Sequence, residues 1–243
     1  MDQDGNPNMP WRFPSERYLK NYLDNIIESV ETQQPFSVIR IGDGELMVLQ
    51  QGLIHPIEYL VKNVPWASGY GYCGTILPNI ELRTRMIDAI KYADLVGVFD
   101  GDPPMMDVFK VIEERYGVTP KNIFYAFDNL FLPMNKDFVK LMVKYPPLLV
   151  GNSAKRFAEY IKNELGIVVP GTLECPDCRH IDATIEAMGK IEHRWSLVSA
   201  GVCAKVICPE MARRYGKVAF DFGHAPDNVM APDYKEYWLV KPD

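Results

Sequence analysis

The sequence has no apolar run long enough to cross a bilayer and no excess of basic residues. Its 243 residues carry a formal net charge of −6, so a broad surface for nucleic acid is not expected. The first residues lack the basic and apolar segments of a signal peptide, and no stretch approaches the roughly 20 apolar residues of a membrane-spanning helix. We therefore expect a cytoplasmic protein with no membrane span and no nucleic-acid partner.

Two familiar nucleotide-binding motifs are also missing. No G-x-G-x-x-G follows the first predicted strand, and the sequence holds no G-x-x-x-x-G-K-[ST]. The glycines of these motifs bring the backbone close to phosphate, and their absence removes the main support for an NAD-binding or P-loop protein.

Cysteine is scarce, at five residues. An odd number in a chain of this length argues against a disulfide framework. Cys175 and Cys178 form a C-x-x-C pair, but a structural zinc site needs about four ligands, and no second pair stands at the required spacing. The sequence therefore predicts reduced thiols in a loop.

Short apolar runs alternate with amphipathic patterns along nearly the whole chain, which predicts an α/β fold. Residues 1–13 are polar and contain proline, so we expect a flexible arm followed by a single domain over residues 14–243. The alternation implies a Rossmann-like, mostly parallel sheet flanked by helices, with right-handed crossovers. Strands are expected at 37–41, 95–99, 122–127, 147–150, 167–169, 195–199 and 217–222, and helices at 14–31, from the end of the 42–45 turn to about 51, at 79–93, 104–116, 136–144, 154–165, within 181–190 and at 202–215.

One long segment, residues 53–78, has no regular pattern. It is rich in glycine and proline and contains the aromatic residues Trp66, Tyr70 and Tyr72. Long loops in compact domains are often functional, so these rings are candidates for stacking on a sugar. Packing of the rings under the loop is an equal alternative.

The most informative stretch is the end of the first strand, where Gly42, Asp43, Gly44 and Glu45 follow one another. Ligands in open α/β sheets bind beyond the carboxyl ends of the strands. Two carboxylates at this place suit Mg²⁺ or Mn²⁺, which need only one or two protein carboxylates beside water and phosphate. Asp43 and Glu45 are therefore predicted metal ligands, and a solvated turn with a helix cap is the alternative.

The segment Arg40-Ile41-Gly42-Asp43-Gly44-Glu45 resembles the R-x-G-D-G-E signature of the GT-D-fold glycosyltransferases. A second segment, from Ser199-Ala200-Gly201 to Asp221-Phe222-Gly223-His224, resembles the glycine turn, helix and Asp-x-Gly-His strand end of that family. The two motifs lie near opposite ends of the chain. The resemblance implies a GT-D-type fold and a metal-dependent enzyme that moves a hexose from a nucleotide sugar, with UDP as the nucleotide, to a hydroxyl of a glycan or glycoprotein.

Such a reaction needs groups that neutralise a leaving diphosphate, because negative charge grows on the phosphate oxygens. Asp43 and Glu45 would hold Mn²⁺ or Mg²⁺. Donor-binding residues would come from both motifs, with a helix N-terminus cradling the diphosphate; the candidates are Arg40, Gly42, Gly44, Ser199, Gly201, Lys205 and Asp221. A structural ion pair for Arg40 and a solvated surface position for Lys205 are the competing interpretations.

Proton transfer from the acceptor hydroxyl needs a base at a strand end. Asp102 is a candidate, with Asp100 and Asp128 as alternatives that the sequence does not rank. His224 is a candidate metal ligand, phosphate donor or proton carrier. Residues 151–154 also end a strand and open a helix, where a plain N-cap by Asn152 or Ser153 is favoured over an anion site.

Two other functions remain open at this point. A metal-dependent phosphohydrolase would also use aspartates at strand ends, but it would need no acceptor sugar. A non-catalytic module that binds glycans or nucleotide sugars is a third hypothesis, against which the intact acidic residues argue. A homo-oligomer is compatible with the sequence.

Overall fold

A computed structural model describes residues 16–65, 67–69, 73–99 and 102–231. The predicted arm (1–13), the aromatic residues Trp66, Tyr70 and Tyr72, and Asp100 lie outside the described residues.

The core is a seven-stranded, wholly parallel sheet. Its strands run in the order β3-β2-β1-β7-β6-β4-β5. The central strands are buried on both faces, which is why they read as continuous apolar runs rather than alternating ones. The strands are β1 (Phe36–Arg40), β2 (Leu95–Val98), β3 (Ile123–Tyr125), β4 (Leu148–Gly151), β5 (Thr172–Leu173), β6 (Trp195–Ser199) and β7 (Val218–Asp221).

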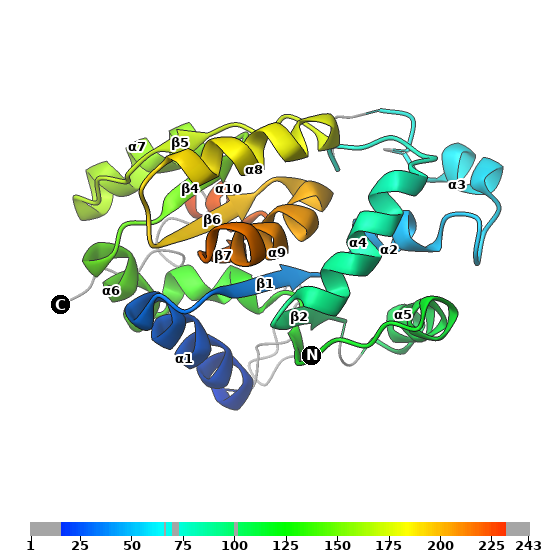
Figure 1. Cartoon of the computed structure of the whole chain (residues 1–243), viewed down its shortest axis with the longest axis horizontal. Helices are drawn as coiled ribbons and strands as arrows, with labels where there is room; N and C mark the ends of the chain where they lie inside the picture. The colour runs from blue at the N-terminus through cyan, green and yellow to red at the C-terminus, as the bar shows by residue number, and fades with distance from the viewer. Residues whose placement is uncertain (1–15, 66, 70–72, 100–101, 232–243) are drawn as a thin grey trace.

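Helices cover both faces of this sheet (Figure 1). One core cluster packs α2, α4, α5, α8 and α9 on one face, and a second packs α1, α6, α7 and α10 on the other. The helices are α1 (Glu16–Thr32), α2 (Asp43–Gln50), α3 (Ile57–Asn63), α4 (Ile80–Tyr92), α5 (Pro103–Tyr116), α6 (Lys136–Lys144), α7 (Ala154–Leu165), α8 (Ile181–Lys190), α9 (Ala204–Tyr215) and α10 (Ala225–Met230), with 3-10 turns η1 (Asp128–Met134), η2 (Cys178–His180) and η3 (Gly201–Cys203).

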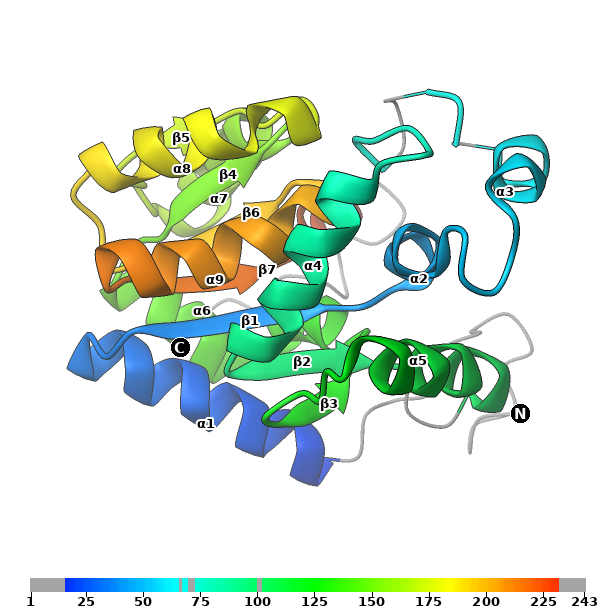
Figure 2. The same cartoon turned by 45° about the vertical axis from the view of Figure 1, so that its right-hand side comes forward.

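The chain crosses from one face to the other several times at the strand ends. β1 leads directly into α2, as Figure 2 shows, and β6 leads through η3 into α9, on the same face. β4 and β7 lead into α7 and α10 on the opposite face. The helices diverge above β1, β7, β6 and β4, which leaves room for a ligand at this edge.

The predicted alternation of strands and helices is confirmed, with local differences. The strand expected at 167–169 is wrong, because Ile167 is buried under the end of α7 while Val168 is 67% exposed and unpaired with the sheet. The strand next to β4 is instead β5, at Thr172–Leu173. The irregular segment 53–78 contains a helix, α3, that its prolines and glycines hid.

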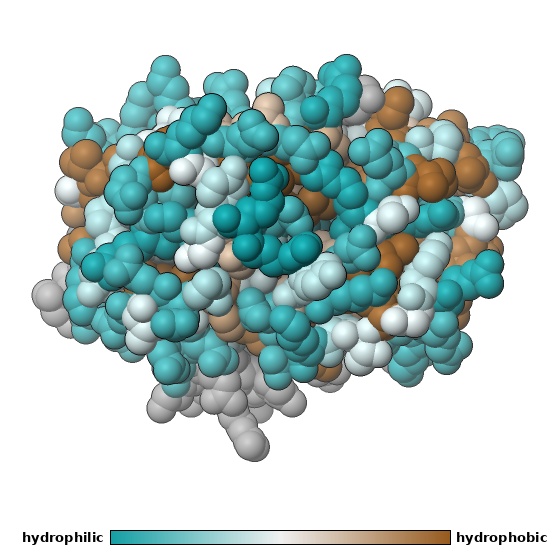
Figure 3. Space-filling view, viewed as in Figure 1, coloured by the Kyte–Doolittle hydropathy of each residue, from teal (hydrophilic) through white to brown (hydrophobic). Residues whose placement is uncertain are grey.

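The face seen in Figure 3 carries mostly hydrophilic side chains over α8 and α9, and its hydrophobic residues form small separate groups. Among the described residues, no helix combines the length and the apolar character that crossing a bilayer requires.

Candidate functional site

A cavity of about 300 Å³ lies at the carboxyl ends of four neighbouring strands. We call it the strand-end cavity. The loops after β1, β4, β6 and β7 line it, together with parts of three further loops. Its lining comprises Arg40, Gly42–Glu45, Cys73, Gly74, Phe127, Asn152, Ser153, Arg156, Cys175, Pro176, Ser199–Val202, Lys205, Gly223, His224 and Asp227.

Both sequence motifs therefore contribute to one cavity, although more than 150 residues separate them in the chain. Lys205 of α9 connects them directly. Its Nζ lies 2.7 Å from Glu45 Oε1 and 3.0 Å from Asp221 Oδ2. Parallel strands end at the same edge of a sheet, and this explains why distant segments meet here.

Lys205 is almost fully buried, with 2% of its side chain exposed, and its ammonium group is fully used. Besides the two carboxylates, it donates a hydrogen bond to the Gly201 carbonyl oxygen at 3.1 Å. Burial alone would lower the pKa of Lys205, but Asp221 and Glu45 raise it above its ordinary value. An ammonium has three donors, and all three are directed at the protein.

Asp221 is the second centre of the buried network. Burial alone would raise its pKa, but Arg40 and Lys205 lower it below the usual range for an aspartate. Arg40 Nη2 lies 3.3 Å from Asp221 Oδ1, and the Arg40 backbone N–H donates to Oδ2. Arg40 also donates to Ala126 O and to Asn129 Oδ1. The structural ion pair weighed for Arg40 is thus present.

Asp43 and Glu45 lie in different surroundings. Helix α2 begins at Asp43, so the two residues are separated by about 200° around the helix axis rather than aligned along an extended turn. Glu45 is buried, and its Oε2 accepts a hydrogen bond from the Gly42 N–H at 2.8 Å while Oε1 pairs with Lys205. Asp43 is exposed and lines the cavity.

His224 follows β7 and lines the cavity beside Asp227. Part of its surface faces solvent, but the surrounding protein removes water from the ring and lowers its pKa, with a further contribution from the positive charges of Arg40 and Lys205. The imidazole is therefore neutral at neutral pH, the form that accepts a proton.

The structure does not bring Asp102 to the cavity. Its carboxylate accepts a hydrogen bond from the Met105 N–H and caps the start of α5. Asp128, another strand-end candidate, is fully buried outside the cavity, and burial raises its pKa to about 7. Both residues follow a strand, as the sequence indicated, but Asp102 caps a helix and Asp128 lies in the core.

The glycine turn after β6 is closed by protein. The Val202 N–H donates to the carbonyl oxygen of Cys73, and the Cys203 N–H to that of Ala200. Gly201 has a φ of +54°, and a Cβ there would lie 2.8 Å from the Cys73 carbonyl oxygen. Close approach of the Cys73 loop, rather than of a phosphate, explains glycine at this position.

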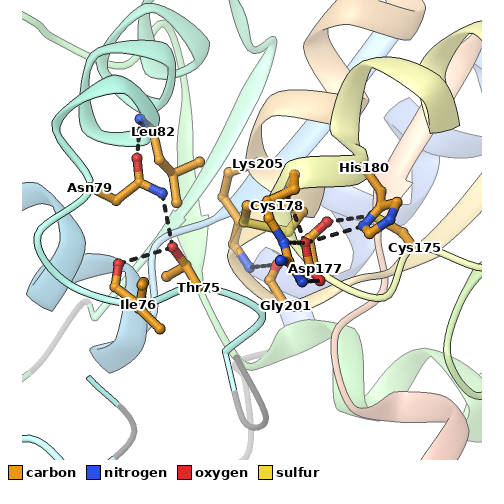
Figure 4. The surroundings of a disulfide bond; sticks show 12 residues. Thr75, Ile76, Asn79, Leu82, Cys175, Asp177, Cys178, His180, Gly201 and Lys205 are labelled. Carbon is orange, nitrogen blue, oxygen red and sulfur yellow. Dashed lines mark hydrogen bonds and ion pairs between the residues drawn. A yellow bond between two sulfur atoms is a disulfide. The ribbon is translucent and has the colours of Figure 1, made fainter. Parts of the chain in front are cut away.

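The prediction of reduced thiols at Cys175 and Cys178 is wrong for Cys178, which is disulfide-bonded to Cys203, and is confirmed for Cys175, which is free. Figure 4 shows the bond beside Lys205 and Gly201. The fold brings Cys178 to the start of α9, 25 residues further along the chain, a pairing that the sequence spacing does not reveal. Cys175 and Cys73 are free, and burial, followed by the charges of Glu45 and Asp43, raises the pKa of Cys73 to about 12. Cys73 is therefore a neutral thiol.

Sequence reasoning missed Arg156 and Asp227, which line the cavity and form an exposed ion pair at 3.0 Å. Arg156 lies in the first turn of α7. Its place in the sequence, shortly after a predicted strand and a glycine, could have indicated a residue of the site. Ser153, favoured as a plain N-cap, makes no capping hydrogen bond.

This geometry, a parallel sheet with a polar cavity over its central strand ends, defines an α/β protein with a ligand site at the carboxyl edge. Comparison with known proteins identifies the family. The profile of the GT-D fold-like domain matches residues 19–229, and the chain belongs to this family, whose fold suggests a glycosyltransferase.

Two solved structures are similar to this chain. One, described as "Selenomethionine substituted structure of domain of unknown function 1792 (DUF1792)", has a TM-score of 0.54 at 15% sequence identity, over 93% of this chain and 87% of that one. The other, described as "The highly conserved domain of unknown function 1792 has a distinct glycosyltransferase fold", has a TM-score of 0.45 at 13% identity, over 89% and 87%. No curated protein matches the chain.

Proposed function

We propose that the protein is a glycosyltransferase that moves a hexose from a UDP-sugar to a hydroxyl of a glycan or glycoprotein acceptor. The observation that carries the proposal is the strand-end cavity of a GT-D-family chain, in which the exposed Asp43 and His224 both lie. We keep the cytoplasmic location, and the possibility of a homo-oligomer, as predictions from the sequence.

A divalent ion, Mn²⁺ or Mg²⁺, is part of this proposal, and the residues fit it in one specific way. The described residues contain no cluster of three or more acidic, histidine or cysteine side chains that could hold a metal. Glu45 is engaged by Lys205 and the Gly42 N–H, which leaves Asp43 as the available carboxylate of the two predicted ligands. Mg²⁺ is often bound by one or two carboxylates plus substrate phosphates, so we expect metal binding to depend on the donor.

When bound, the ion would neutralise charge on the leaving diphosphate. The chain's own residues would do the rest. His224 would take the proton of the acceptor hydroxyl, because its lowered pKa keeps the imidazole unprotonated at neutral pH. Lys205 and Arg40 would act as positioning residues, since they hold Glu45 and Asp221 in place at the floor of the cavity.

The test is a comparison of Asp43→Asn with wild type in sugar transfer from UDP-hexoses and in thermal shift with UDP, with and without Mn²⁺. Asp43 is exposed in the first turn of α2, where the helix dipole favours a carboxylate by at most about 1 kcal/mol, so the variant should fold normally with at most a small fall in unfolding temperature. We expect transfer to fall by about a hundredfold or more and the metal-dependent part of the UDP shift to disappear.

A matched control is Asp107→Asn, which removes an exposed carboxylate from α5, away from the cavity. This variant should transfer sugar at the wild-type rate. Wild-type turnover in Asp43→Asn would contradict the metal role of Asp43. Hydrolysis of the UDP-sugar at the same rate with and without acceptor would favour the hydrolase hypothesis.

A further inference from the structure

Three helices of eight or more residues, α2, α7 and α9, begin at the strand-end cavity. The first turn of α2 carries the carboxylates of Asp43 and Glu45 and does not suit an anion, so the comparison is between α7 and α9. At the start of α9, the N–H groups of Val202, Cys203 and Ala204 all donate to backbone carbonyls. The one lysine of that turn, Lys205, is neutralised by Glu45 and Asp221. The place at which the sequence predicts a diphosphate cradle is therefore filled by the protein itself.

The start of α7 is different. Ser153 stands at its N-cap but makes no capping hydrogen bond, and no side chain of the described residues accepts from the N–H groups of residues 154–156. Ser153 is only 7% exposed and lines the cavity. Ser153 has helical backbone angles (φ −90°, ψ −3°) rather than the extended angles of a capping residue, so its hydroxyl is not used as a cap and can donate to a ligand in the cavity.

The charges at the start of α7 support the same conclusion. Lys155 and Arg156 occupy the first turn, which contains no acidic residue. Cations at a helix N-terminus are unfavourable, because the backbone dipole already places positive charge there. A bound anion would turn this arrangement into a favourable one.

Arg156 can reach such an anion. Its guanidinium lines the cavity and pairs with Asp227 at 3.0 Å, but the side chains are 71% and 50% exposed. An exposed pair of this kind contributes little, so Arg156 can exchange Asp227 for a phosphate, with which it makes bidentate hydrogen bonds.

The turn before α7 is built close to β6. Gly151 ends β4 with a φ of +130°, and a Cβ there would overlap the carbonyl oxygen of Ser199. Only glycine permits this contact. Ser153 and Ser199 both line the cavity, and the hydroxyl of Ser199 is buried and has no hydrogen-bond partner among the described residues.

We propose that the start of α7 is the oxyanion subsite of the strand-end cavity, where Ser153, Arg156 and the N–H groups of the first turn bind a phosphate group of the nucleoside diphosphate donor. The inference rests on the proposed function for the identity of the ligand. It moves the diphosphate from α9, where the sequence predicts it, to α7.

Calorimetric titration of the full chain with UDP, with pyrophosphate and with uridine tests the inference. Arg156→Gln should weaken binding of UDP and of pyrophosphate by about tenfold, because a charged hydrogen bond is lost, and Ser153→Ala should weaken both by about threefold. Uridine binding should be unchanged. Neither variant should lower the unfolding temperature, since Arg156 is exposed and Ser153 caps nothing.

Two further variants make the test specific. Lys155→Gln removes a charge from the same turn, but Lys155 does not line the cavity, so binding should stay within about twofold of wild type. Asp227→Asn releases Arg156 and removes a negative charge from the cavity, so it should strengthen pyrophosphate binding by about twofold to threefold.

Equal losses in Arg156→Gln and Lys155→Gln would overturn the inference, because they would show a diffuse charge effect. If pyrophosphate binding depended on Arg156 but UDP did not bind, the phosphate bound at α7 would not belong to a nucleoside diphosphate donor, and the inference would be wrong. If the Arg156 and Ser153 variants bound UDP and transferred sugar like wild type, the subsite would be refuted. The proposed function would remain, because it is tested by the Asp43 variant.

Discussion

Helices α7 and α9 both follow a strand of the same sheet and both begin at the strand-end cavity, yet one start is open and the other is closed. At α9, the Cys73 loop covers the turn, a disulfide holds Cys203, and Lys205 is buried between carboxylates. At α7, the N-cap hydroxyl is uncommitted and the cations lie at the surface.

The difference shows that a strand–glycine–helix pattern does not by itself define an anion site. The dipole of a helix start attracts anions only when its N–H groups and nearby cations have no partners within the protein. The α9 start is therefore best understood as a structural connection between the two motifs, and the α7 start as the place where the cavity can bind charge. The variants below test this contrast, from the largest expected effect to the smallest.

The largest effect is expected for Lys205→Met. The substitution removes the cation but leaves Glu45 and Asp221 buried and without their shared partner. Breaking a buried ion pair costs about 3–5 kcal/mol, and urea unfolding should show a loss of this size. Lys155→Met, at the exposed start of α7, is the matched control and should change stability by less than about 0.5 kcal/mol. A loss below about 1 kcal/mol for Lys205→Met would mean that the α9 start is not closed by this network.

The disulfide is the second part of the closed start. Cys178→Ser should lower the free energy of unfolding by about 3 kcal/mol, because the bond restrains a loop that spans 25 residues of sequence. Reduction with dithiothreitol should destabilise wild type by a similar amount and leave the variant unchanged. Equal sensitivity of both proteins to the reductant would contradict the Cys178–Cys203 pairing.

Gly201→Val tests whether the turn before α9 is shaped by packing or by a ligand. A side chain at this φ of +54° is strained and meets the Cys73 carbonyl oxygen, so we expect a loss of stability of about 1–3 kcal/mol. UDP binding to the remaining folded protein should change by less than about threefold. Gly69→Val is the control, because a Cβ at Gly69 meets no atom within 4 Å. If Gly201→Val lost UDP binding without losing stability, the start of α9 would be the diphosphate site after all.

The general arrangement could be predicted from the sequence because it depends on local patterns. Alternating strands and helices predicted the parallel sheet, and parallel strands share one edge, so the segments at Asp43 and His224 were expected to meet there. The residues at the carboxyl ends of β1, β6 and β7 do line one cavity.

The details that depend on long-range pairing could not be predicted in this way. Lys205 looked like a surface or phosphate-binding residue because its partner Glu45 is 160 positions earlier in the chain. Cys178 was expected to be a reduced thiol because no partner cysteine stands at a telling spacing, but it pairs with Cys203 across the fold. Ser153 had the residue type of an N-cap, and only its geometry shows that it does not act as one.

The smallest effect concerns the open start of α7 itself. Lys155→Glu replaces an exposed cation in the first turn by an acidic residue, which the helix dipole favours. The free energy of unfolding should rise by about 0.3–1 kcal/mol at low ionic strength, and salt should reduce the gain because the charge is at the surface. Urea unfolding at two salt concentrations measures both effects. The same exchange in the last turn of α7, Lys162→Glu, should have the opposite sign, since that end of the helix favours a cation. If Lys155→Glu destabilised the protein, the N–H groups of the first turn of α7 would not attract negative charge, and its start would be as closed as that of α9.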